Sequence, residues 1–248
     1  MVGFIILFTG FLFFFNIGNR DLWAPDEPRY AQVSKEMRDS GNFIVPHLNS
    51  DPYPDKPPLL FWLINVSSLL PGEISPLTAR IPSALAGVGC CLAVFFLGRR
   101  LFQNNGIALM SALILATSSK FLWMAHRVAF DVILTFFVTM ALLCFYRGYT
   151  EQKNRGWFYL LFYVCMALGV LAKGPIGFIL PFCTVLTYLI VKRDAGALKS
   201  AKPWIGAAIF LAIVFSWVCL AVIYGGKEYT HQILFKQNVG RFASSFAH

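Results

Sequence analysis

The stretch DLWAPDEPRYAQVSKEMRDSGNFIVPHLNSDPYPDKPPLL, residues 21–60, is the longest polar run in a chain that is otherwise apolar. It contains seven of the twelve acidic residues, including the adjacent Asp26 and Glu27. One apolar segment precedes this stretch and another follows it, so we expect it to lie at a membrane surface. We interpret it as the reactive loop of the protein, held in place by membrane-spanning segments.

The overall composition is that of a membrane protein. Hydrophobic residues make up 57% of the chain and charged residues only 13%, whereas soluble domains carry about 25% charged residues. The net charge of +9 would suggest nucleic acid as a partner of a soluble protein. Here the basic residues cluster in short loops between apolar segments, as membrane topology requires, so we expect membrane lipids and no nucleic acid as partners.

The apolar segments predict an all-α fold, a polytopic transmembrane bundle of about seven spans, each needing about 20 residues. The expected spans are 2–18, 77–98, 106–124, 131–147, 157–173, 175–191 and 203–224. The first lacks the basic start and cleavage site of a signal peptide, so we expect it to be retained. The run 59–70 is too short to span, and is either re-entrant or the start of the second helix, broken at Pro71-Gly72. Gly174 and Pro175 predict a tight helical hairpin.

The loops predict how the chain is oriented, because cytoplasmic loops are enriched in Lys and Arg. Alternate loops place nine basic residues on one face, with only Glu151 and Asp194 against them. The nine are Arg99, Arg100, Arg147, Lys153, Arg155, Lys192, Arg193, Lys199 and Lys202. We expect this face to be cytoplasmic. The loop 19–75, the turn 120–131, Lys173 and the tail after Tyr224 then meet on the extracytoplasmic side.

Within the first loop, residues 28–40 predict a short amphipathic helix lying in the membrane interface. Pro28 suits a first helical turn, Asp26 or Glu27 can cap the helix, and Gly41 can end it. Tyr30, Val33 and Met37 share one face at helical spacing. The six cysteines lie in apolar segments without CxxC spacing, so we expect small core residues rather than disulfides or a zinc site.

Two acidic positions are candidates for catalysis. Asp26, beside Glu27, is either a simple helix cap or a general base whose pKa is raised by the neighbouring carboxylate and the apolar surroundings. Asp131 stands at the head of a span, four residues after Arg127, so on one helix the two side chains would face each other. That pair is either a local ion pair or part of a site, since ionisable groups at membrane depth are usually functional.

Five basic residues fall near the same surface, namely Arg29, Lys56, Arg80, Arg127 and Lys173. Each alone can be a side chain that reaches toward lipid headgroups. Together they can bind a phosphate or pyrophosphate, which needs several convergent donors. The chain has no HExxH, GxGxxG or GxxxxGK[ST] motif, which argues against a metalloprotease and nucleotide-driven chemistry. A lipid-linked donor suits such a site.

The motifs of this chain resemble those of the aminoarabinose transferase and protein-O-mannosyltransferase-like superfamily, membrane glycosyltransferases of the GT-C fold that use polyprenyl-phosphate sugars. The motifs are Asp26-Glu27 with Arg29-Tyr30, YPDKPP at 53–58, Arg127 with Asp131, LAKGPIGFILP at 171–181, and QNVGRF at 237–242 followed by His248. The resemblance covers nearly the whole chain.

The resemblance implies roles for individual residues. Asp26 matches the catalytic acidic residue, Asp131 a second acidic residue of the cleft, and Lys56 a basic residue near the donor phosphate. Arg29, Arg127 and Lys173, which belong to the basic cluster described above, are expected to help bind that phosphate. Asp55 and His248 match a pair that contacts a divalent metal in the aminoarabinose branch, although Glu is usual at the position of Asp55.

The implied activity is transfer of a sugar from a polyprenyl-phosphate donor to lipid A, lipopolysaccharide or protein at the periplasmic face of the bacterial inner membrane. Family members are about twice as long, so we expect residues 1–248 to be the transmembrane transferase domain without the family's C-terminal spans and soluble domain, which a second chain would have to supply. A non-catalytic fragment that binds polyprenyl lipid, and a transporter or flippase, remain the alternatives.

Overall fold

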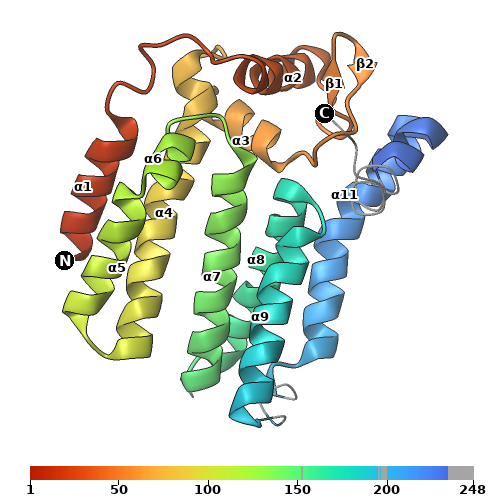
Figure 1. Ribbon diagram of the computed structural model, residues 1–248. Helices are drawn as coiled ribbons and strands as arrows, with labels where there is room; N and C mark the ends of the chain where they lie inside the picture. The colour runs from red at the N-terminus through yellow and green to blue at the C-terminus, as the bar shows by residue number, and fades with distance from the viewer. Residues whose placement is uncertain (152, 195, 197–199, 234–248) are drawn as a thin grey trace, which may run out of the picture.

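The computed structural model of the chain describes residues 1–151, 153–194, 196 and 200–233. It is mostly helical. Long helices run side by side, and shorter elements from the first polar loop cover one end of them (Figure 1). The expected helical membrane bundle is confirmed at this level, and the polar loop 21–60 lies at the covered end, which we call the loop end.

The helices are α1 (Val2–Phe14), α2 (Asp26–Ser40), α3 (Leu59–Ser67), α4 (Pro76–Phe102), α5 (Asn105–Thr117), α6 (Ser119–Ala125), α7 (Phe130–Thr150), α8 (Arg155–Lys173), α9 (Ile176–Lys192) and α11 (Pro203–His231). A hairpin of two-residue strands, β1 (His47–Leu48) and β2 (Asp51–Pro52), was not predicted. Its turn is held by Glu36, whose carboxylate accepts hydrogen bonds from the backbone N–H groups of Asn49 and Ser50.

The expected number of about seven spans is not matched by helix length. In the described part of the chain, four helices are long and apolar enough to cross a membrane: α4, α7, α8 and the Pro203–Gly226 part of α11. The helices α5 and α6 are together long and apolar enough, but they meet at an angle of 67°. Counted as one broken span, they raise the number to five. The other two expected spans, α1 and α9, have 13 and 17 residues and are shorter than the helix that a straight crossing needs.

The amphipathic helix of the first loop is confirmed as α2, which begins at Asp26 and ends before Gly41, whose φ of 69° suits glycine. Tyr30, Val33 and Met37 are buried on its inner face, where they pack against α3 and neighbouring residues. The predicted acidic cap is wrong: Pro25 takes the N-cap position, and no side chain caps the helix there. The acidic residues instead lie in the first turn, where the helix dipole favours them.

The run 59–70 forms a separate short helix, α3, which packs against α2 and α4. The tight hairpin predicted at 173–175 is confirmed, since α8 ends at Lys173 and α9 begins at Ile176. The two helices touch through glycines: a Cβ added to Gly177 would stand 2.1 Å from the carbonyl carbon of Gly169. This contact allows α8 and α9 to pack backbone to backbone.

All six cysteines are free thiols. Cys90, Cys91, Cys144 and Cys165 are buried, as expected, but Cys183 and Cys219 are exposed on the outer faces of α9 and α11. An apolar segment fixes the character of the helix but not which way each residue faces, so the prediction of core positions was wrong for these two.

Candidate functional site

A pocket of about 140 Å³ opens at the loop end of the bundle. Its wall combines α2, the loop before α3, the segment from α6 to the start of α7, and the last residue of α8. Five of the predicted site residues line it: Asp26, Lys56, Arg127, Asp131 and Lys173. Glu27 and Tyr30 line it as well. Two other predicted site residues, Arg29 and Asp55, do not line it. The structure thus brings together acidic and basic residues that are far apart in the sequence.

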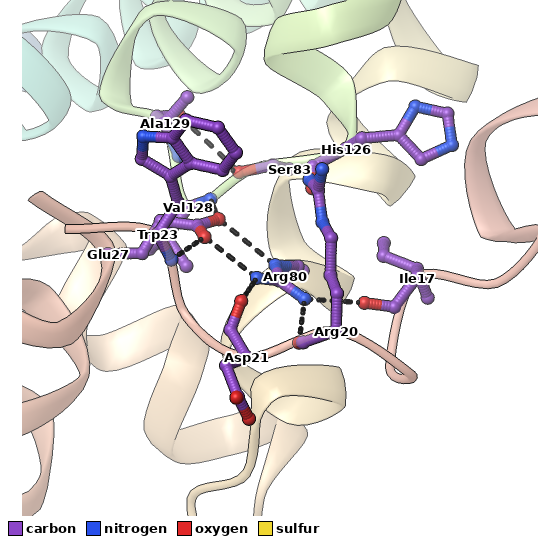
Figure 2. Close-up of polar contacts among 10 residues, drawn as sticks. All are labelled: Ile17, Arg20, Asp21, Trp23, Glu27, Arg80, Ser83, His126, Val128 and Ala129. Carbon is purple, nitrogen blue, oxygen red and sulfur yellow. Dashed lines mark hydrogen bonds and ion pairs between the residues drawn. The ribbon is translucent and has the colours of Figure 1, made fainter.

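The loop that carries Asp26 is fixed by a buried ion pair between Glu27 and Arg80 (Figure 2). The Arg80 side chain is 0% exposed. Its Nε and Nη2 donate to the two carboxylate oxygens of Glu27 at 3.0 and 2.7 Å. Its remaining N–H groups donate to the backbone carbonyls of Ile17, Arg20 and Asp21 at 2.7–2.9 Å. All five donors of the guanidinium are used within the protein, so the expectation that Arg80 binds phosphate is wrong.

The Glu27 carboxylate is equally saturated. Besides the two bonds from Arg80, it accepts the backbone N–H of Trp23 at 2.7 Å and that of Val128 at 2.9 Å. Burial alone would raise the pKa of Glu27, but the hydrogen bonds from Arg80, Trp23 and Val128 outweigh it and lower the pKa. The pKa of Glu27 is lowered because four hydrogen-bond donors stabilise its charged form.

The turn between α6 and α7 is held by two further contacts from the same region. The Ser83 hydroxyl accepts the backbone N–H of Ala129 at 3.0 Å, and Arg20 donates to the His126 carbonyl at 2.8 Å (Figure 2). Together with the Glu27–Val128 bond, these contacts fix the residues immediately before α7. Asp131, in the first turn of α7, is thereby placed at the pocket.

Asp131 forms an ion pair with Lys173, the last residue of α8. The predicted pairing of Asp131 with Arg127 rested on one continuous helix, but α7 begins only at Phe130. The Arg127 guanidinium instead lies over the ring of Trp123 at 4.3 Å and that of Trp23 at 5.2 Å. Such cation–π contacts leave much of the charge available to an anion in the pocket.

Asp26 is the accessible member of the acidic pair, with 61% of its side chain exposed. Its neighbour in the structure is Arg29, one turn along α2, at 3.7 Å. Arg29 also interacts with Tyr53, so it supports the rim of the pocket and does not enter it. Lys56 lines the pocket as well, with its Nζ 6.0 Å from the centre of the Phe130 ring.

The sequence analysis gave no individual role in the site to three aromatic residues that line the pocket, Tyr30, Trp123 and Phe130. The Tyr30 ring packs edge-on against Phe130 at 4.9 Å. Burial, and then the charge of Asp26, raise the pKa of Tyr30, so its hydroxyl stays a hydrogen-bond donor. The helical spacing of Tyr30 with Val33 and Met37 had marked it only as a packing residue. The YxxVxxxM spacing carries no signal for a second role.

The predicted metal pair stays a prediction. Asp55 lies in the loop after β2, near Tyr53, and outside the pocket wall. His248 and the QNVGRF motif at 237–242 fall outside the described residues. Among the residues that the structure describes, no group of three His, Cys, Asp or Glu side chains could hold a metal ion.

Comparison with known proteins shows which family the sequence of this chain matches. Residues 55–219 match the family described as dolichyl-phosphate-mannose-protein mannosyltransferase. An undecaprenyl phosphate-alpha-4-amino-4-deoxy-L-arabinose arabinosyl transferase from Edwardsiella ictaluri is 32% identical over 92% of this chain. A protein of Aquifex aeolicus with no described function is 31% identical over 93% of it.

Solved structures share the fold. The crystal structure of ArnT from Cupriavidus metallidurans bound to undecaprenyl phosphate superposes with a TM-score of 0.87, at 25% identity over 96% of this chain. The same protein in the apo state gives a TM-score of 0.83 at 24% identity. This chain spans 44% of the ArnT chain, and 41% and 45% of the two relatives above.

The helical bundle, the fold of ArnT and the match over residues 55–219 agree with one another, and they identify a multi-pass integral membrane protein. The names of the matched proteins are those of glycosyltransferases that transfer arabinosyl or mannosyl groups. The chain therefore belongs to the dolichyl-phosphate-mannose-protein mannosyltransferase family, with an ArnT-like GT-C fold.

Proposed function

We propose that the pocket at the loop end takes part in transferring a sugar from a polyprenyl-phosphate donor to an envelope acceptor, such as lipid A, lipopolysaccharide or protein. One observation carries the proposal: two carboxylates, Asp26 and Asp131, converge with three cations, Lys56, Arg127 and Lys173, in one pocket. Glycosyl transfer from a phosphate needs a group that accepts a proton and cations that stabilise the departing phosphate.

The two carboxylates have different surroundings, which separates their roles. Asp131 is paired with Lys173, so its charge is already compensated. Asp26 is exposed, and its ion pair with Arg29 is long, at 3.7 Å, and solvent-screened. We therefore assign Asp26 as the general base, and the Asp131–Lys173 pair as the group that orients the acceptor. Lys56 and Arg127 remain to receive the phosphate.

The reaction follows from this assignment. The acceptor hydroxyl gives its proton to Asp26 while its oxygen forms a bond to the anomeric carbon of the sugar. The bond between that carbon and the phosphate oxygen breaks, and the electron pair leaves with the polyprenyl phosphate. The transition state has oxocarbenium character, as in glycoside chemistry generally. Lys56, Arg127 and the Tyr30 hydroxyl can stabilise the negative charge that grows on the phosphate.

The names of the relatives support this donor class. The Edwardsiella ictaluri protein is named for an undecaprenyl phosphate-linked amino sugar, and the ArnT structure contains undecaprenyl phosphate. The charge asymmetry of the loops, nine basic residues against two acidic ones on the face opposite the pocket, supports a periplasmic location for the site. The same proposal includes about seven membrane spans and a catalytic loop at 19–75.

The test is sugar transfer in membranes of a bacterial host that lacks its own transferase of this type, with lipid A analysed by mass spectrometry. Wild type is compared with Asp26→Asn and with the control Asp39→Asn, an exposed carboxylate on the same helix outside the pocket. Because this chain spans less than half of its relatives, each variant is tested alone and with the remaining length of a relative supplied as a second chain.

We expect a sugar-sized mass gain with wild type and Asp39→Asn, and none with Asp26→Asn at equal membrane abundance. Transfer by Asp26→Asn at the wild-type rate would refute the assignment of the base. A lack of transfer by every variant in both arms, together with retention of polyprenyl phosphate by the purified chain, would favour the non-catalytic lipid-binding alternative instead.

A further inference from the structure

A second polar pocket, of about 480 Å³, lies at the opposite end of the bundle from the loop end. It is formed where α4 and α7 end and α5 begins (Figure 1). Three arginines line it: Arg99 and Arg100 from the last turn of α4, and Arg147 from the last turn of α7. The amide side chains of Gln103 and Asn105 complete its polar wall.

Two of the arginines are held in place by one carboxylate. Glu151 accepts from Arg100 at 2.5 Å and from the Nε of Arg147 at 3.1 Å. The Arg147 guanidinium also stacks over the Phe158 ring at 4.1 Å. Glu151 therefore fixes two guanidinium groups side by side and cancels only one of their charges. Such preorganised guanidinium groups lose little side-chain entropy when they bind an anion.

The third arginine, Arg99, adds a charge that no described residue compensates. Among the described residues, the Arg99 side chain takes part in no ion pair, hydrogen bond or ring contact. The pocket wall thus carries three positive charges against the single negative charge of Glu151 beside it. The pocket also lies at the N-terminal end of α5, where the helix dipole favours negative charge.

We propose that this pocket binds the phosphate of a phosphate ester through Arg99, Arg100 and Arg147. Guanidinium groups bind phosphate through paired N–H donors, and three convergent groups suit its tetrahedral oxygens. Phe96 and Leu143 form the apolar part of the wall, which suits a glycerol backbone or the start of an acyl chain. The same chemistry is offered by a lipid headgroup and by a soluble phosphate ester, and the experiment separates them.

Membrane orientation alone does not account for this arrangement. Any basic residues in the loops of this face would serve the charge rule for topology. That rule does not require three of the nine to converge on one pocket, or two of them to share a carboxylate. The proposal concerns the end of the bundle away from Asp26 and Asp131, so it stands or falls independently of the transferase activity.

The test is native mass spectrometry of the whole chain in neutral detergent, with phosphatidylglycerol added over a range of concentrations. Diacylglycerol, which lacks the phosphate, is the comparison lipid, and glycerol 3-phosphate is added as a soluble competitor. The variants are Arg99→Gln and Arg99→Gln/Arg100→Gln. The control is Lys153→Gln/Lys192→Gln, which removes two charges from exposed residues of the same face outside the pocket. Arg99→Gln removes no ion pair, side-chain hydrogen bond or ring contact within the described chain, so it tests binding at little cost to the fold.

We expect one phosphatidylglycerol to bind to the wild-type chain at least about tenfold more tightly than diacylglycerol, which corresponds to one or two charge-assisted hydrogen bonds. The double arginine variant should lose most of this preference, Arg99→Gln a part of it, and the lysine control none. Displacement by glycerol 3-phosphate would assign a soluble ligand, and no displacement a lipid. Equal losses in the arginine and lysine double variants, or no loss in either, would overturn the proposal.

Discussion

Replacing Glu27 by Gln should destabilise the protein strongly, although it changes only one non-hydrogen atom of the side chain. Each Glu27 oxygen accepts two hydrogen bonds, one from Arg80 and one from the backbone N–H of Trp23 or Val128. In the variant, an NH₂ group replaces one of these oxygens and faces two N–H donors. Those two donors lose their acceptor, and Arg80 loses its counter-charge in a site where its side chain is 0% exposed.

The size of the effect follows from that geometry. A buried donor left without an acceptor costs about 1–3 kcal/mol, and a buried ion pair that loses one partner costs about 3–5 kcal/mol. The two figures describe overlapping effects, so we expect a loss of about 3–5 kcal/mol in total. In a chain of this size, 1 kcal/mol lowers the melting temperature by about 2–4 °C, which predicts a decrease of at least about 6 °C.

The cysteines of the chain provide the assay. Cys183 and Cys219 are exposed and are first replaced by Ser, whereas Cys90, Cys91, Cys144 and Cys165 are buried. A maleimide dye that fluoresces on reaction with thiols then reports unfolding as the protein is heated in detergent. Asp39→Asn serves as the control, because that exposed carboxylate lies on the same helix and its loss should change the stability by less than about 0.5 kcal/mol.

The reasoning would be refuted if Glu27→Gln melted within about 2 °C of wild type. That result would mean that the side chain turns or shifts at little cost, and that the ion pair adds no net stability beyond its own desolvation. A large decrease in both Glu27→Gln and Asp39→Asn would show instead that α2 tolerates no change of charge.

Folding lowers the pKa of Glu27. Its contribution to stability should therefore be complete above the ordinary carboxyl pKa of about 4.5, and be lost as the pH falls through the lower pKa of the folded state. In melting experiments over an acid pH series, the advantage of wild type over Glu27→Gln should shrink only below about pH 4.5. Lys173→Met should abolish sugar transfer while lowering the free energy of unfolding by less than about 1 kcal/mol, because 32% of the Lys173 side chain and 49% of that of Asp131 are exposed. Transfer and melting temperature are measured on the same preparation. A large decrease of the melting temperature would argue for a purely structural pair. Gly177→Ala should destabilise the α8–α9 hairpin by more than about 2 kcal/mol, because its Cβ would stand 2.1 Å from the Gly169 carbonyl carbon. Gly156→Ala is the matched control, since its Cβ meets nothing within 4 Å. This control should melt at or above the wild-type temperature.

The sequence located the polar residues of the site but could not assign their partners. Asp26 and Glu27 are adjacent and chemically alike, yet successive residues of a helix point about 100° apart. Glu27 therefore turns into the bundle, where it is buried against Arg80, and Asp26 stays exposed at the pocket. Which of the two would turn inward depends on where α2 packs, and this is decided by residues far from it in the sequence.

The same limit explains the wrong partner of Asp131. Spacing along one helix suggested Arg127 as the partner. However, α6 ends at Ala125 and α7 begins only at Phe130, so Arg127 and Asp131 do not share a helix. The partner of Asp131 is Lys173, which lies 42 positions away. Hydropathy likewise marked the apolar segments but could not detect the 67° bend between α5 and α6. That bend depends on a single extended residue, Ser118, with ψ near 120°.

The hydrogen bonds of Glu27 also have a consequence for the order in which the protein is built during synthesis. Arg80 is made 53 positions after Glu27, and Val128 follows 101 positions after it. Because ribosomes build the chain from its N-terminus, Glu27 can meet Arg80, and join the first loop to α4, while α7 does not yet exist. The bond to Val128 can form only later, when it joins the bonds from Ser83 and Arg20 that fix the turn before α7 at the pocket. A nascent chain stalled before residue 128 would thus have its first loop anchored and its pocket still open.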